Sequence, residues 1–136
     1  ISDYKIKKMH LPAISIDYGT RKSWLAYSVE TFAFAWKTVA TKELLEILPK
    51  FIQDKKAKTI VIWMPFNIDG TMSQHGRRVE SFAKKIEKIT NLPIILQDER
   101  LTSSEAEMAF SDMGIEWDID AEAARLILES WIENEE

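Results

Sequence analysis

The stretch that most constrains the fold is residues 14–20, where alternating apolar residues end in an acid that is followed by a Gly-Thr turn. A short β-branched run closed by glycine predicts a buried strand, here residues 13–17, with the carboxylate of Asp17 at its end. A buried carboxylate is costly unless it is paired or bound to a cation. Two interpretations of Asp17 therefore stay open: it caps its own turn through backbone N–H groups, or it binds a ligand.

Four more segments have the pattern of strands. Residues 23–29 and 32–37 follow the first strand directly, and the three together predict an antiparallel meander. Residues 59–63 form a continuous apolar run, which predicts a fully buried strand parallel to the first one. Residues 93–97 predict another short buried strand. The chain is therefore expected to contain a mixed five-stranded sheet.

Helical periodicity predicts one helix on each side of the fourth strand. The first is expected to begin at Thr41 and to end or kink at Pro49. The second is expected to begin with a capping box formed by Thr71 and Gln74. The apolar residues expected on the inward faces of these two helices are Leu44, Leu45, Leu48, Ile52, Val79, Phe82, Ala83, Ile86 and Ile89. The cations expected on the outer faces of the second helix are Arg77, Arg78, Lys84, Lys85 and Lys88.

Two further helices are predicted after the last strand. Thr102 and Glu105 form a second capping box, for a helix that reaches about Phe110. The final helix is expected from Asp120 to Ile132. Its expected inward residues are Ala123, Ala124, Ile127, Leu128 and Trp131, and its expected outward residues are Glu122, Arg125, Glu129 and Glu133. The order of elements predicts one α/β domain over residues 1–136, with helices flanking the sheet.

The composition limits the function classes. With 46% hydrophobic and 29% charged residues, the chain matches an ordinary soluble globule. It contains no cysteine, which excludes disulfides, thiolate zinc sites and cysteine nucleophiles. No apolar run approaches the length of a membrane span, so no membrane partner is expected and a cytoplasmic location is predicted.

Charge is divided unevenly along the chain. Residues 1–97 hold 16 Lys and Arg against 9 Asp and Glu, whereas residues 98–136 hold 2 against 13. A basic body with an acidic C-terminal part fits a polyanion partner on one face and cations near the other. Solvated helix surfaces would explain the same division, so charge alone does not separate the two interpretations.

Three acids are expected to meet at one rim of the sheet. Asp17 ends the first strand, Glu99 follows the last strand, and Asp120 starts the final helix on its inward stripe. Convergent carboxylates raise one another's pKa unless a cation neutralises them, and oxygen ligands suit Mg²⁺ or Mn²⁺. Each acid also has a simpler interpretation, for example Asp120 as an N-cap and Glu99 as the partner of Arg100.

Four sequence blocks resemble those of a known family. They are residues 16–22 (Ile-Asp-Tyr-Gly-Thr-Arg-Lys), 65–71 (Pro-Phe-Asn-Ile-Asp-Gly-Thr), 98–103 (Asp-Glu-Arg-Leu-Thr-Ser) and 119–124 (Ile-Asp-Ala-Glu-Ala-Ala). In the same order, they resemble motifs of the YqgF family of Holliday junction resolvases and pre-ribosomal-RNA nucleases. The resemblance extends over residues 13–133.

The resemblance implies an RNase H-like fold and a cytoplasmic nuclease that depends on Mg²⁺ or Mn²⁺. It implies Asp17, Glu99 and Asp120 as catalytic, metal-binding acids, and the 5′ end of pre-16S ribosomal RNA as the substrate. Two alternatives stay open. One is a Holliday junction resolving DNA endonuclease, which needs a symmetric homodimer rather than a monomer. The other is a catalytically weakened nucleic-acid-binding or ribosome-assembly factor.

Nucleic acid is the expected partner, and RNA is favoured over DNA. The candidate contacts come from the motif blocks and from the basic helix. They are Arg21, Lys22, Asn67, Arg77, Arg78, Arg100 and Thr102. Lys84, Lys85 and Lys88 of the same helix are also expected to follow a phosphate backbone, although a solvated helix face would explain them too. Asp69 and Asp98 match motif positions to which the resemblance assigns no definite role.

The chain departs from the family pattern at two tryptophans. Trp24 and Trp63 stand where the family usually has glycine, and residues 114–118 are acidic where the family often has lysines. One hypothesis is that the two rings fill one space by stacking on each other, and another is that they are core packing without functional consequence. A third is that at least one ring lies at the mouth of the cleft and stacks on an unpaired base.

Overall fold

The structure is a computed structural model that describes residues 10–65, 67, 69–98 and 119–133; at Asp98 and at residues 119–121 it describes the backbone alone. The predicted capping box at Thr102 and the helix to Phe110 lie outside these residues. The same holds for the departure at residues 114–118.

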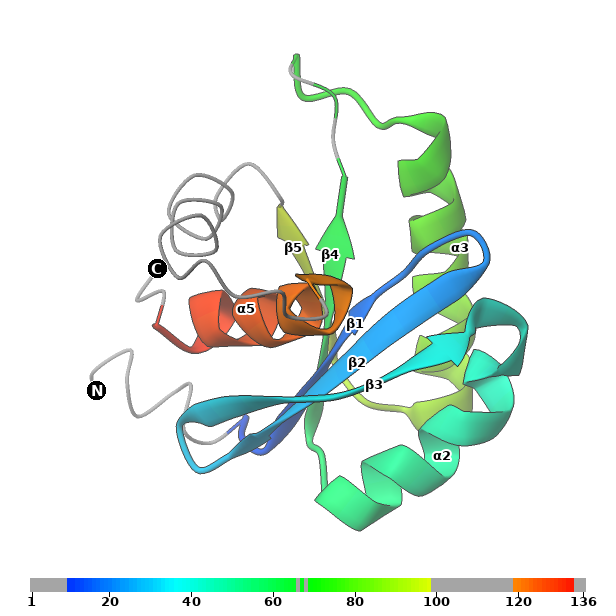
Figure 1. The fold of residues 1–136 in the computed structure, drawn as a ribbon. Helices are drawn as coiled ribbons and strands as arrows, with labels where there is room; N and C mark the ends of the chain where they lie inside the picture. The colour runs from blue at the N-terminus through cyan, green and yellow to red at the C-terminus, as the bar shows by residue number, and fades with distance from the viewer. Residues whose placement is uncertain (1–9, 66, 68, 99–118, 134–136) are drawn as a thin grey trace.

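Five strands form one mixed sheet in the order β3-β2-β1-β4-β5 (Figure 1). They are β1 (Ala13–Asp17), β2 (Lys22–Val29), β3 (Phe32–Ala40), β4 (Thr59–Met64) and β5 (Ile94–Asp98). The central strand β1 pairs antiparallel with β2 and parallel with β4, and β5 pairs parallel with β4. The predicted meander and the predicted parallel strands are therefore confirmed. Since β1, β4 and β5 run in one direction, their carboxyl ends share one edge of the sheet.

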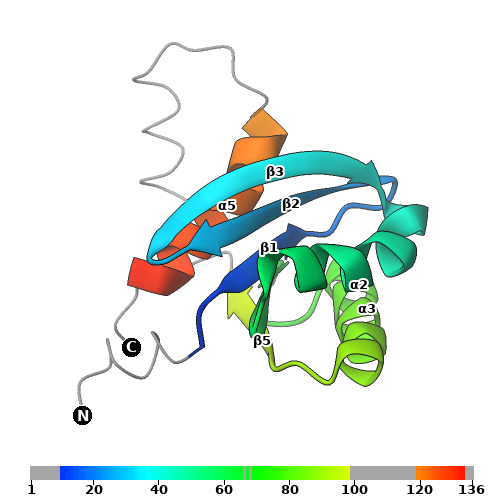
Figure 2. The ribbon, with the colours of Figure 1, turned by 90° about the horizontal axis from the view of Figure 1, so that it is seen from below.

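Helices cover both faces of this sheet (Figure 2). The short 3₁₀ helix η1 (Thr41–Glu43) leads into α2 (Leu44–Lys55), and α3 (Gln74–Thr90) packs beside α2 on the same face. The final helix α5 (Ile119–Glu133) covers the other face. Each face has its own apolar cluster, so the sheet is buried on both sides, as parallel strands require.

β3 differs from its prediction because it contains a bulge. Leu25 is opposite Lys37 and Ala26 is opposite Ala35, so Trp36 is an extra residue on β3. The strand was predicted to end at residue 37. In the structure the bulge shifts the alternation of inward and outward side chains, and β3 continues to Ala40. The ring of Trp36 stacks on Phe51 of α2, with 4.2 Å between centroids.

Two predicted helix boundaries differ in the structure. Of the two outcomes expected at Pro49, an end or a kink, the end is wrong, because α2 continues to Lys55. Pro49 is exposed, so water can hydrate the carbonyl that loses its N–H partner to the proline ring. The N-cap of α3 is Ser73 rather than Thr71, because the Oγ of Ser73 accepts a hydrogen bond from the N–H of Gly76 at 2.9 Å.

Two inward predictions are also wrong, since Leu45 is 39% exposed and Ile89 is 54% exposed. Burial on α2 falls instead on Leu44, Leu48 and Phe51, whose spacing of four and three residues defines a stripe that Leu45 does not share. Ile89 lies in the last turn of α3, past the final buried residue of that helix.

The turn between β1 and β2 is held by a hydrogen-bond network to η1. The Thr41 hydroxyl donates to the carbonyl of Gly19 at 2.7 Å, and the Ser23 hydroxyl lies 2.8 Å from the Thr41 hydroxyl. Because the only hydroxyl proton of Thr41 goes to Gly19, the Ser23 hydroxyl donates to Thr41. Ser23 in turn accepts from the N–H of Gly19 at 3.3 Å. The chain that follows Asp17 is thus fixed to the start of α2.

Gly19→Ala is expected to lower the free energy of unfolding by about 1–3 kcal/mol, because the added Cβ would overlap the carbonyl oxygen of Lys22, which is backbone and cannot yield freely. Urea unfolding of the variant checks this. Thr20→Ala, at the exposed neighbouring position, is the matched control. Equal stability of both variants and the parent would show that the turn tolerates a side chain.

Candidate active site

Asp17 lies in a row of four residues that crosses the sheet near its carboxyl edge. Asp17 is opposite Trp24 of β2, and Ile16 is opposite Ile62, which places Trp63 next to Asp17 on β4. Trp63 is in turn paired with Gln97 of β5. The Asp17 side chain is half-buried and both indoles are partly buried. The predicted strand-end carboxylate therefore has two large aromatic rings as its neighbours in the sheet.

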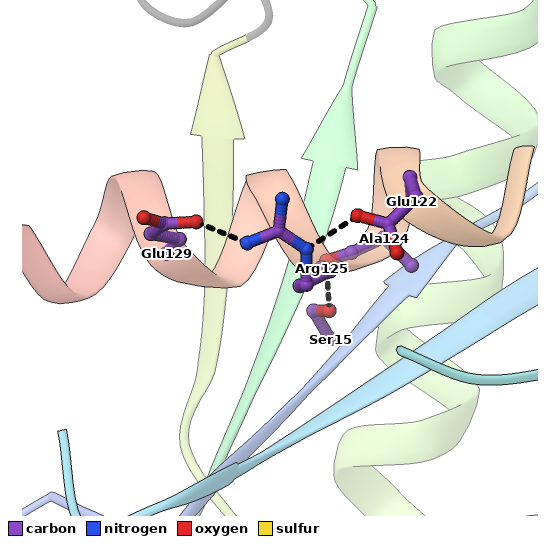
Figure 3. Close-up of polar contacts among 5 residues, drawn as sticks. All are labelled: Ser15, Glu122, Ala124, Arg125 and Glu129. Carbon is purple, nitrogen blue, oxygen red and sulfur yellow. Dashed lines mark hydrogen bonds and ion pairs between the residues drawn. The ribbon is translucent and has the colours of Figure 1, made fainter. Parts of the chain in front are cut away.

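This row faces α5, because side chains alternate along a strand and Ser15 points to that helix. The Ser15 hydroxyl, fully buried, donates a hydrogen bond to the carbonyl of Ala124 at 2.6 Å (Figure 3). Asp120 is one helical turn before Ala124. The start of α5 is thereby anchored to β1 two residues from Asp17, although the Asp120 side chain is not among those described.

The outward residues of α5 are not simply solvated. Arg125 donates through Nε to Glu122 and through Nη1 to Glu129, so one guanidinium links two turns of the helix (Figure 3). Its side chain is 30% exposed and that of Glu122 only 15%, so the prediction that these residues point outward is wrong in part. Burial alone would lower the pKa of Arg125, but the hydrogen bonds and charges of the two glutamates outweigh it and raise the pKa.

Two donors in this row, one on β4 beside Asp17 and one on β5 beyond it, are buried without a partner among the described residues. Within the described part of the chain, neither Trp63 Nε1 nor Gln97 Nε2 has a hydrogen-bond partner, although both atoms are buried. An unpaired buried donor costs about 1–3 kcal/mol, and such groups concentrate at functional sites. Gln97 was not among the predicted site residues. The sequence feature that could have identified it is a polar residue at the end of the apolar run 94–96, just before the acidic motif.

Of the three predicted catalytic acids, the structure describes only the Asp17 side chain. Glu99 lies outside the described residues, as do Arg100 and Thr102. Among the described side chains, no group of three or more metal-ligating residues occurs. The predicted meeting of the three acids thus stays a prediction, with Asp17 and the backbone of Asp120 on the same side of the sheet.

The predicted basic contacts lie around the turn after Asp17. Arg21 is exposed in that turn and Lys22 at the start of β2, and Arg77 and Arg78 are exposed in the first turns of α3. His75, for which only a surface or packing role was expected, joins the two segments because its Nε2 lies 2.9 Å from the carbonyl of Tyr18. A carbonyl can only accept, so Nε2 carries the proton of this bond.

The loop after β4 uses most of its polar groups internally. Asn67 donates through its backbone to the carbonyl of Thr71 and through its side chain to the Thr71 hydroxyl, at 2.8 and 3.0 Å. Asp69 accepts from the hydroxyl and the N–H of Thr71, at 2.6 and 2.9 Å. The hydrogen bond from the Thr71 hydroxyl, followed by that from its N–H, lowers the pKa of Asp69. The carboxylate of Asp69 therefore stabilises its own turn. Asn67 is exposed.

A family model described as RuvX, a Holliday junction resolvase, matches residues 12–134. The chain belongs to this family. Its membership confirms the predicted RNase H-like α/β class and the resemblance to YqgF proteins.

Curated relatives within the RuvX family cover almost the whole chain. A protein of Maridesulfovibrio salexigens named "Putative pre-16S rRNA nuclease" is 37% identical in an alignment that covers 90% of this chain and 98% of the relative. Proteins of the same name from Rickettsia bellii and Acaryochloris marina are 36% and 32% identical, over 93% and 90% of this chain and 89% and 92% of the relatives. Family and names together support a hydrolase that acts on nucleic acid.

Trp24 and Trp63 lie on either side of Asp17. The described ring pairs include none between Trp24 and Trp63. β1 separates them, so their backbones are about 10 Å apart, two strand spacings. Both rings pack against the apolar cluster under α5. Core packing is therefore part of their role, but the hypothesis that they stack on each other is not supported.

None of the helices in the described ranges has the length and hydropathy needed to cross a bilayer.

Ser15→Ala is expected to lower the free energy of unfolding by about 0.5–1.5 kcal/mol, because it removes the buried hydrogen bond that holds α5 to β1. Amide exchange in α5 is expected to accelerate more than exchange in α3. Hydrogen exchange monitored by NMR checks both effects, with Ser81→Ala on the exposed side of α3 as the control. If α5 exchanged as in the parent, the Ser15 hydroxyl would not be what anchors the helix.

Proposed function

We propose that this protein is a divalent-metal-dependent nuclease that processes the 5′ end of pre-16S ribosomal RNA, with Asp17, Glu99 and Asp120 as its catalytic acids. The observation that carries the proposal is the half-buried Asp17 carboxylate at the carboxyl end of the central strand, on the side of the sheet where α5 begins. Relatives bearing the name of a pre-16S rRNA nuclease support the choice of RNA.

The donor chemistry at Asp17 fits Mg²⁺ or Mn²⁺. A carboxylate oxygen is the ligand that these hard cations prefer, and the chain has no cysteine to favour a softer metal. In this proposal Asp17, Glu99 and Asp120 hold the metal. When bound, divalent cations stabilise the attacking and leaving oxygens of phosphodiester hydrolysis.

The remaining residues bind and orient the substrate. Arg21, Lys22, Arg77 and Arg78 are exposed beside the turn that follows Asp17, where they would neutralise backbone phosphates. Trp24 and Trp63 flank the carboxylate and limit the access of water to it. Further candidate contacts are Asn67, Arg100 and Thr102.

The proposal places this activity in one RNase H-like domain over residues 1–136, working in the cytoplasm as a monomer. The second candidate function is a Holliday junction resolving endonuclease, which the description of the matching family favours. Paired cuts in a junction require two active sites related by symmetry, so this candidate requires a homodimer.

Purified protein is expected to cleave a single-stranded precursor RNA with Mg²⁺ or Mn²⁺ and to lose that activity in excess EDTA. Asp17→Asn is expected to reduce cleavage by at least about a hundredfold, since an amide is a poor substitute for an anionic metal ligand. Gel-resolved cleavage assays measure both effects. Asp54→Asn, an exposed acid on α2, is the matched control and should cleave like the parent.

A four-way DNA junction is the competing substrate in the same assay. Symmetric cleavage of the junction by a dimer, with RNA left intact, would favour the resolvase over the RNA nuclease. Full activity in EDTA or in Asp17→Asn would refute the metal-dependent mechanism. RNA binding without cleavage at any Mg²⁺ or Mn²⁺ concentration would instead indicate a binding factor.

A further inference from the structure

A groove of about 400 Å³ lies on the face of the sheet opposite α5. Three segments that are distant in sequence form it: the turn after β1, the start of α2 with η1, and the outer side of α3. Lys42, Arg78 and Lys85 supply its charge, and Tyr18 and Leu45 supply apolar surface. The groove starts at Tyr18, the residue directly after Asp17.

The charge in the groove is of one sign. Its lining contains two lysines and an arginine but no carboxylate. The acid on the neighbouring part of α3, Glu80, is paired instead with Lys84 at 3.6 Å. Within the described residues, Lys42, Arg78 and Lys85 make no ion pair, and all three are exposed. Among the described residues, the groove therefore offers an anion three cations that no ion pair engages.

The spacing of these cations suits an extended polyanion rather than a single small ion. Arg78 and Lys85 are seven residues apart on α3, so they lie on one side of the helix about 10 Å apart along its axis. Lys42 faces them from η1 across the groove. Cations lie on both walls of the groove and at two positions along the α3 axis, so successive phosphates of one nucleic-acid strand could each contact one of them.

The apolar part of the groove is fixed in position. The ring of Tyr18 packs on Phe82 at 4.6 Å between centroids, and His75 holds the carbonyl of Tyr18 at 2.9 Å. Leu45, the residue expected inward but found exposed, contributes to the same wall. An aromatic ring beside a track of cations is the arrangement with which proteins bind single-stranded nucleic acid.

The hydrogen bonds around Gly19 fix two walls of the groove, the turn after β1 and η1, relative to each other. Thr41, which lines the groove next to Lys42, donates to Gly19, and the N–H of Thr41 donates to the carbonyl of Arg21 at 2.8 Å. The wall formed by the turn and the wall formed by η1 are therefore one hydrogen-bonded unit. Such a site needs little ordering when a ligand binds.

We propose that this groove binds the single-stranded segment of the substrate next to the bond that is cleaved, with phosphates on Lys42, Arg78 and Lys85 and a base or ribose against Tyr18 and Leu45. The proposal rests on the proposed function in that the ligand is the nucleic-acid substrate. Of the cations on α3, the proposal assigns substrate contacts to Arg78 and Lys85, which line the groove, and none to Lys84 and Lys88.

The test compares two double variants that remove the same charge. Binding of a fluorescein-labelled single-stranded RNA is measured by anisotropy over a range of salt concentrations in EDTA, where no cleavage is expected. The variant Lys42→Gln with Lys85→Gln is expected to lower the slope of log affinity against log salt by about 1.4, which corresponds to two phosphate contacts with a single strand. The control, Lys84→Gln with Lys88→Gln, is expected to keep the parental slope.

A third variant tests the aromatic wall. Tyr18→Leu keeps an apolar side chain against Phe82 but cannot stack on a base, and it is expected to weaken binding about fivefold or more with an unchanged salt slope. If the two double variants lowered affinity and slope equally, binding would be diffuse and the groove would not be the site. Parental binding by the Lys42 and Lys85 variant would also overturn the proposal.

The outcome separates the groove from the proposed function. If the parent cleaves RNA while the groove variants bind like the parent, the groove proposal alone fails. If the groove variants lose binding as expected while the parent cleaves no nucleic acid with Mg²⁺ or Mn²⁺, the proposed activity alone fails.

Discussion

The rest of the structure depends on β1 being buried on both faces and ending in a carboxylate. Ile14 and Ile16 are completely buried toward α2 and α3, whereas Ala13 and Ser15 are completely buried toward α5. A strand without a solvated face has its register fixed from both sides, because a slip of one residue would exchange the two sets. Asp17 is therefore held at one position at the edge of the sheet, where ligands of α/β proteins bind.

The residues at the end of β1 contribute to the proposed metal site on one face of the sheet and to the proposed substrate groove on the other. Asp17 belongs to the α5 face, with Trp24 and Trp63 beside it, and Tyr18 belongs to the opposite face, where it packs on Phe82. The carboxylate that would hold the metal and the groove that would hold the substrate strand are thus one residue apart in the chain. The hydrogen bonds from Thr41 and His75 fix the short segment that connects them.

The sequence was sufficient to predict the sheet because its signals are local. The apolar runs at 13–17 and 59–63 are short and bounded by turn residues, which favours strands, and the meander and the parallel pairing were predicted from the order of elements. The strand order itself comes from the structure. Predictions failed where the surroundings of a residue, either solvent or packed neighbours, outweigh a local rule. Pro49 is tolerated within α2, Trp36 is accommodated by a bulge, and Leu45 is exposed beside a groove that involves three distant segments.

The candidate site was predictable to a smaller extent. Asp17 follows from its strand. The buried donors of Trp63 and Gln97, which have no partner among the described residues, become apparent only when β4 and β5 are paired in register. The role of Lys42 could not be predicted from the sequence. An exposed lysine at a helix start is common, and its role depends on which segment faces it. Glu99 stays a prediction.

The most direct test of the central claim, that Asp17 binds a divalent metal at the end of β1, is a titration of ¹⁵N-labelled protein with Mn²⁺. Paramagnetic broadening falls steeply with distance, so the indole N–H signals of Trp24 and Trp63 are expected to broaden before that of Trp36, which packs on Phe51 on the other face. Asp17→Asn is expected to abolish this order. Equal broadening of all three signals, or unchanged selective broadening in the variant, would contradict the account.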